Sequence, residues 1–151
     1  MNEYQKLLAY LKILYHNLTT LRRHLVKDIA WFSNHEQIGE WYGEVSAQID
    51  DLVETGIALG YQEPGIKEAV LEYSVDCLSV QPREPEESFR LILEALRKAT
   101  GLMQAAEAIV PANVANKLQE YEYHWNKEAN FKLAAAIGAH ARSDGAEYDD
   151  D

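Results

Sequence analysis

Apolar residues recur every three or four positions through four long stretches of this chain, at about residues 3–27, 35–59, 85–110 and 113–136. That spacing places the side chains along one face of a helix. No stretch shows the sustained alternation typical of a strand, so the sequence predicts an all-α fold. The first stripe is Tyr4, Leu7, Leu8, Leu11, Leu14, Tyr15, Leu18, Leu21 and Leu25. The second stripe is Ile38, Tyr42, Val45, Ile49, Leu52, Gly56 and Leu59.

Residues that favour helix ends mark where the four helices begin and stop. Residues 28–34 form the predicted first connection, with Asn34 as the N-cap of the second helix. Gly60 is a good C-terminal stop for that helix. Pro85 suits the first turn of the third helix, and Pro111 separates the third helix from the fourth.

The connection between the second and third helices is much longer than the other two. It holds residues 66–73, which could form two short helical turns, and a linker over residues 79–84. Short links make the first and second helices antiparallel neighbours, and likewise the third and fourth. The long link can cross the bundle, which is the ferritin connection. The sequence therefore predicts an all-α, ferritin-like four-helix bundle with a long crossover that carries a short helix.

Composition and charge narrow the function. The 151 residues suit one domain, which we expect over residues 1–142, followed by an acidic tail over 143–151. A net charge of −11 argues against DNA binding and is compatible with cations, and the only basic cluster is Arg22-Arg23-His24 with Lys27. A single cysteine, Cys77, excludes an internal disulfide and has no predicted catalytic partner. We find no signal-peptide pattern and no apolar run of membrane-spanning length, and expect a soluble, cytoplasmic protein.

The histidines do not form the usual di-iron pattern of helical bundles. That pattern needs Glu-x-x-His on two helices, so that both ligands turn inward together, and the sequence has none. Glu120 and His124 are four residues apart, which by itself indicates an ordinary pair on one helix face. We therefore do not expect a di-iron site inside one bundle.

The second helix offers carboxylates on its outer side instead. Asp50 and Glu54 share a face that lies about 140–180° from the apolar stripe at Val45. His35 is on the same side, but about 22 Å away along the helix axis. One metal ion could be held by these groups only if a second copy packed antiparallel along this helix. The alternative is that a chain with 25 acidic residues exposes such pairs by chance.

The stretch from His24 to Gly60 resembles the ferroxidase motif of the Dps miniferritins. That motif has a histidine on the first helix, a second histidine at the start of the second helix, and then Asp, Asp and Glu. At the family's spacing, His35 is followed here by Gly39, Asp50 and Glu54. The resemblance covers most of the chain, more loosely outside the second helix.

Two positions depart from the motif. Gly39 stands where the family has an aspartate ligand, and Glu36 or Glu40 could substitute for it. His24 and His35 are one residue closer together than the family's pair. The family's lysine-rich arm for DNA is absent.

The resemblance implies an iron-oxidising and iron-storing shell of twelve subunits. His24 and His35 would be nitrogen ligands, and Asp50 and Glu54, with Glu40 as the substitute, would supply oxygen ligands at a dimer interface. Fe(II) would be oxidised, with peroxide as the usual oxidant, and stored as ferric mineral. One alternative is a shell of the same kind with a degraded metal site, which is structural or sequesters metal without efficient catalysis. Another is an unrelated helical bundle that binds a partner through an apolar face.

Overall fold

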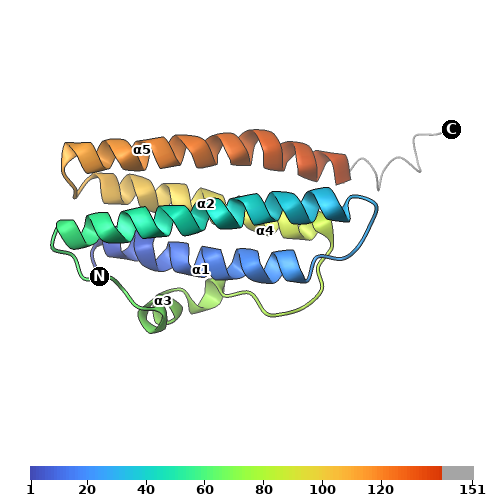
Figure 1. Cartoon of the computed structure of the whole chain (residues 1–151), viewed down its shortest axis with the longest axis horizontal. Coiled ribbons are helices and arrows are strands. Elements are labelled where there is room, and N and C mark those ends of the chain that lie inside the picture. Colours follow the sequence, from blue (N-terminus) through green and yellow to red (C-terminus); the bar gives the residue numbers. More distant parts are fainter. Residues whose placement is uncertain (141–151) are drawn as a thin grey trace.

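A computed structural model describes residues 1–140 as a bundle of long helices (Figure 1). The predicted tail, residues 143–151, lies outside the described residues, as do the last two positions of the predicted domain. Within the described part no residue belongs to a strand, so the all-α prediction is confirmed. No helix over residues 1–140 combines the length and the apolar composition that a membrane crossing requires. The helices are α1 (Glu3–Arg23), α2 (Trp31–Ala58), α3 (Ile66–Glu72), α4 (Pro85–Glu107) and α5 (Ala112–Lys127).

The chain path is that of a ferritin-like bundle. Figure 1 shows α2 running back along α1, and α5 running back along α4. Between α2 and α4 the chain crosses the full length of the bundle through α3 and a short 3₁₀ helix, Ser74–Asp76, so α4 runs parallel to α2 (Figure 1). α3 packs on α1, and α1 also packs on α4. The long crossover with its short helix is therefore confirmed.

The first connection differs from the prediction at both ends. α1 ends at Arg23 because the chain then pairs with the crossover: the amide of Val26 donates to the carbonyl of Arg83 at 2.9 Å. α2 begins at Trp31, one turn early, after the Asp28 carboxylate accepts the amide of Ala30 at 2.9 Å. Asn34 is therefore not an N-cap but a buried residue inside α2.

Two tryptophans anchor the core where α2 faces α5. Trp41 and Trp125 are almost fully buried. The Trp125 indole donates to the Gln48 side chain at 2.7 Å, and the Trp41 indole donates to the Glu128 carboxylate at 3.2 Å. Buried indole N–H groups need such acceptors. This explains why the buried stripe of α2 includes a polar residue, Gln48, that the apolar pattern did not predict.

α5 continues into a π-helical segment, Glu128–Leu133, and then to His140 as α-helix. A π segment adds a residue to the turn and changes the direction in which side chains leave the helix. Here Glu128 is buried and lies between the Trp41 indole and the Lys132 ammonium, which is 3.2 Å from its carboxylate. The segment therefore places one charged group against the core with both an indole and an ammonium as partners.

Gly56 is needed for the packing of α2 on α1. A Cβ at this position would lie 2.8 Å from the ring of Tyr4, which is fully buried and donates its hydroxyl to the carbonyl of Leu52. We expect Gly56→Ala to lower the free energy of unfolding by about 2 kcal/mol, because neither the ring nor the backbone has room to move.

Urea unfolding of the two proteins at equal concentration measures this loss. Gly101→Ala is the control, because nothing lies within 4 Å of a Cβ there. Helix propensity alone should then stabilise the protein by about 0.5–1 kcal/mol. A Gly56→Ala protein as stable as the Gly101→Ala protein would contradict the proposed close contact.

Candidate metal centre

Asp50 and Glu54 lie on the outer side of α2, where both side chains are exposed. They therefore face away from the core of their own bundle, as the helical phase predicts. Neither carboxylate forms an ion pair with a side chain of residues 1–140 within 4.0 Å. A pair of carboxylates one turn apart on a helix is an arrangement that can bind a cation if further ligands approach from outside the chain.

His35 lies near the opposite end of the same helix face. Its ring is half-buried and stacks on the indole of Trp31, with 4.6 Å between the ring centres. Stacking limits the rotation of the imidazole and leaves its position set by the first turn of α2. The structure therefore gives His35 a defined orientation, whereas its role as a ligand stays a prediction.

His24 lies just beyond the end of α1, at the C-cap position. Its carbonyl accepts the amide of Arg83 at 3.2 Å, so its backbone belongs to the pairing between the first connection and the crossover. The family's spacing, one residue longer, would place Arg23 at this site instead of a histidine. His24 as a ligand also remains a prediction.

An arginine occupies the space beside Gly39. A Cβ at position 39 would lie 3.4 Å from a guanidinium nitrogen of Arg22, and the guanidinium also lies over the Tyr42 ring, 5.4 Å from its centre. Tyr42 in turn stacks on Tyr15, with 4.5 Å between ring centres and a hydrogen bond between the two hydroxyls. A positive charge thus stands where the Dps motif would have an aspartate. The basic cluster was visible in the sequence, but its contact with Gly39 was not.

The proposed substitutes for the missing aspartate both lie at the surface of α2. Glu36 and Glu40 are both exposed, and Glu40 accepts the side-chain amide of Gln37 at 3.3 Å. Within residues 1–140, no three His, Cys, Asp or Glu side chains come together as a metal site. A site built from the predicted residues therefore requires a second chain.

The outer face of α2 carries small side chains at its middle and is bordered by two hollows. Small exposed residues, Gly43, Ser46 and Ala47, lie midway between the His35 end and the Asp50 end. Two adjoining hollows border this strip and share Ser46 and Ile49. One measures about 340 Å³ and lies toward α1 and α3, and the other measures about 500 Å³ and reaches Asp50.

His124 of α5 and His140, at the end of the helical continuation of α5, both contact side chains of α2. His124 pairs with Glu44 of α2 at 2.5 Å, and His140 contacts the buried Asn34 amide at 3.3 Å. Glu120, four residues before His124, pairs instead with Lys117 at 3.4 Å. Glu120 and His124 therefore contact different partners.

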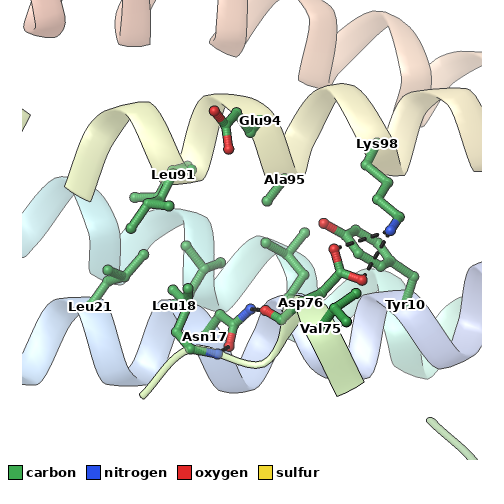
Figure 2. Close-up of a pocket in the computed structure, with 13 residues that line it drawn as sticks. Tyr10, Asn17, Leu18, Leu21, Val75, Asp76, Leu91, Glu94, Ala95 and Lys98 are labelled. Atoms are coloured by element: carbon green, nitrogen blue, oxygen red, sulfur yellow. Dashed lines mark hydrogen bonds and ion pairs between the residues drawn. The ribbon is translucent and has the colours of Figure 1, made fainter. Parts of the chain in front are cut away.

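A hollow of about 310 Å³ lies under the crossover, between α1 and α4 (Figure 2). Figure 2 shows Lys98 reaching Asp76, with both carboxylate oxygens at 3.0 Å, beside the ring of Tyr10. Asn17 donates to the carbonyl of Asp76 at 2.8 Å and accepts the amide of Leu78 at 3.1 Å. These polar groups hold the crossover onto the bundle, so their contacts account for them without a ligand.

Glu107, the last residue of α4, has a raised pKa. Burial, followed by interaction with the neighbouring Glu122, raises the pKa of Glu107 from 4.5 to about 7. The folded state therefore binds this proton more tightly than the unfolded state does. The stabilisation is complete below about pH 4.5 and is lost as the pH rises through about 7.

We expect Glu107→Gln to remove this loss and to be more stable than the unchanged protein at pH 8, by about 1 kcal/mol after allowance for solvent screening. Urea unfolding at pH 5.5 and pH 8 measures the difference. Glu94→Gln, an exposed change on the same helix, should leave the pH dependence as it is. Equal pH dependence of stability in all three proteins would show that the pKa of Glu107 is not raised in the folded state.

Several solved structures share this fold, among them one antigen and two Dps proteins. The TpF1 antigen from Treponema pallidum matches with a TM-score of 0.83 and 16% identity, over 89% of this chain and 88% of that chain. Dps from Listeria monocytogenes matches with a TM-score of 0.79 and 16% identity, over 91% and 94%. Dps from Staphylococcus aureus matches with a TM-score of 0.77 and 20% identity, over 89% and 92%. No protein-family model and no curated protein matches the sequence.

Proposed function

We propose that this chain, whose fold is that of the Dps proteins, is the subunit of an iron-storing shell built from two-fold dimers. In this proposal Fe(II) is the substrate and is oxidised between two subunits. His35 of one chain and Asp50 and Glu54 of the partner subunit bind it. Imidazole nitrogen together with carboxylate oxygen is a donor set that suits Fe(II).

One observation carries the proposal: the spacing along α2 is self-complementary. His35 and Glu54 are centred between residues 44 and 45, and so are position 39 and Asp50. A two-fold axis on the outer face of α2, level with that midpoint, would therefore bring both pairs together at once, and do so twice in each dimer. The exposed side chains at that centre are small, which allows two helices to approach closely.

The chemistry follows from the groups that would meet there. The carboxylates supply negative charge that stabilises Fe(III) more than Fe(II), so they favour loss of an electron from the bound ion. With peroxide as the oxidant, two Fe(II) ions give one electron each. The O–O bond breaks, and two protons complete two molecules of water.

A second candidate function is a shell of the same kind without efficient catalysis. The contact of Arg22 with Gly39 favours this alternative, because a guanidinium stands where an anionic ligand would help to bind the ion. Such a shell would sequester metal without oxidising it efficiently, or would have a structural role.

The mass of the purified protein tests the shell, and iron oxidation separates the two functions. Twelve chains of 17.2 kDa give a particle of about 206 kDa, which size exclusion with light scattering resolves from a monomer or dimer. Anaerobic Fe(II) loading followed by peroxide then measures the oxidation rate. A particle that forms but oxidises iron no faster than buffer would select the second function. A monomer at all concentrations would overturn both.

A further inference from the structure

Opposite charges lie at the two ends of the outer face of α2. The Arg22 guanidinium, which reaches over from α1 to Gly39, lies at one end, and the carboxylates of Asp50 and Glu54 lie at the other. At about 100° per residue, Gly39, Gly43, Ser46 and Asp50 fall within about 60° of one another around the helix. The Arg22 guanidinium, which lies against Gly39, is thus on the same stripe as Asp50.

Neither of these charges is paired within its own chain over residues 1–140. No carboxylate there lies within 4.0 Å of the Arg22 guanidinium, although Glu36 and Glu40 are close in sequence to Gly39, which the guanidinium contacts. Asp50 is eleven residues beyond Gly39, a rise of about 16 Å, which is beyond the reach of the Arg22 side chain. Residues 1–140 of the same chain therefore supply a partner for neither charge, which leaves both available to a second copy of the chain.

We propose that Arg22 pairs with Asp50 of the partner subunit across the two-fold axis, and that this ion pair competes with metal for the carboxylate. The inference rests on the proposed two-fold dimer, since the axis that brings position 39 opposite Asp50 also brings His35 opposite Glu54. Arginine is suited to this role because its planar fork can bind a carboxylate through two hydrogen bonds.

The position of Arg22 is fixed before the partner arrives. The guanidinium lies over the Tyr42 ring, and the Tyr15–Tyr42 stack supports that ring from α1. Gly39 leaves room for it, because no side chain fills the space at that position. A pre-positioned guanidinium loses less side-chain freedom on pairing, so more of the electrostatic attraction contributes to association.

The pair couples assembly to metal occupancy. Without metal, Arg22 neutralises Asp50 of the partner subunit and the dimer is held by two such pairs. When a metal ion binds, the carboxylate must exchange the guanidinium for the ion, so the site binds metal more weakly than it would without Arg22. Removing Arg22 should therefore weaken the metal-free dimer and strengthen metal binding, two changes in opposite directions.

The test compares Arg22→Gln with Arg23→Gln, which loses the same charge from an exposed neighbour that does not contact Gly39. Sedimentation of chelator-treated protein over a dilution series measures association. We expect R22Q to weaken association about tenfold, as two partly exposed ion pairs allow, and R23Q to change it little. We expect R22E to weaken it further, and the charge exchange R22E/D50R to restore it. Equal association of R22Q and R23Q, or no recovery in R22E/D50R relative to R22E, would overturn the pair.

Zn(II) calorimetry on the assembled proteins supplies the second arm. At subunit concentrations well above the dissociation constant of the dimer, R22Q should bind Zn(II) about tenfold more tightly than the unchanged protein does. Unchanged or weaker Zn(II) binding would contradict the competition. An unchanged protein that stays monomeric would overturn the dimer and the pair together. If the unchanged protein assembles and R22Q associates equally strongly, the ion pair alone is overturned.

Discussion

Glu54→Gln is expected to lower the initial rate of peroxide-driven Fe(II) oxidation about tenfold or more, without changing the mass of the particle. The amide keeps the size of the side chain but removes the negative charge that binds the ion and favours its oxidation. Glu54 is the better residue to change because the inferred Arg22 pair uses Asp50, so association should be unaffected. Stopped-flow absorbance of the ferric product measures the rate.

Two controls make this result interpretable. Glu72→Gln removes an exposed carboxylate from α3, far along the chain from the proposed site, and should oxidise iron at the unchanged rate. Light scattering on each variant checks that the particle is intact. If Glu54→Gln and Glu72→Gln oxidise iron equally fast, Glu54 is not a ligand and the proposed site is wrong.

Trp41→Ala is expected to lower the free energy of unfolding by about 4 kcal/mol. The indole is 1% exposed, meets the ring of Phe89 edge-on and donates to Glu128 at 3.2 Å. The change therefore leaves a cavity and also takes one hydrogen-bond donor from a buried carboxylate. Trp41→Phe should cost about 2 kcal/mol, since it fills most of the cavity but still removes the donor.

Guanidinium unfolding of metal-free protein at one fixed subunit concentration measures both losses, because assembly stabilises the folded state by mass action. Phe131→Ala, at a side chain that is 72% exposed, should change stability by less than about 0.5 kcal/mol. A Trp41→Phe protein as unstable as Trp41→Ala would mean that the Glu128 contact, and not the packing, dominates at this position.

The helices themselves were predictable because their apolar residues recur at the helical period. The pattern at Ile38, Val45 and Leu52 identified the buried face of α2, and the same phase predicted that Asp50 and Glu54 face outward. These features depend only on local helix geometry, so a single sequence is enough to predict them.

Features set by contacts between distant segments were not predictable in the same way. Asn34 looks like an N-cap, yet α2 begins earlier because Asp28 holds the turn before it. Gln48 is buried because Trp125, on another helix, needs an acceptor. The π segment at Glu128 likewise depends on a partner, Trp41, that is distant in sequence.

The candidate site also combines features that the sequence predicts with features that depend on contacts between distant segments. The sequence predicted which carboxylates face outward and that Gly39 departs from the Dps motif. It did not predict that Arg22 fills the space beside Gly39, because that contact depends on how α1 and α2 are aligned. This contact is the basis of our proposal that a positive charge, and not only a missing ligand, distinguishes the site from the Dps motif.

The most direct test is a crystal structure of the assembled protein soaked with Zn(II), with an anomalous map calculated at the zinc edge. We expect two-fold dimers whose axis passes the outer face of α2 level with residues 44 and 45. We also expect an anomalous peak between His35 and Glu54 of the partner subunit. Dimers formed through another face, or zinc bound only away from these residues, would contradict the proposed dimer and its metal site.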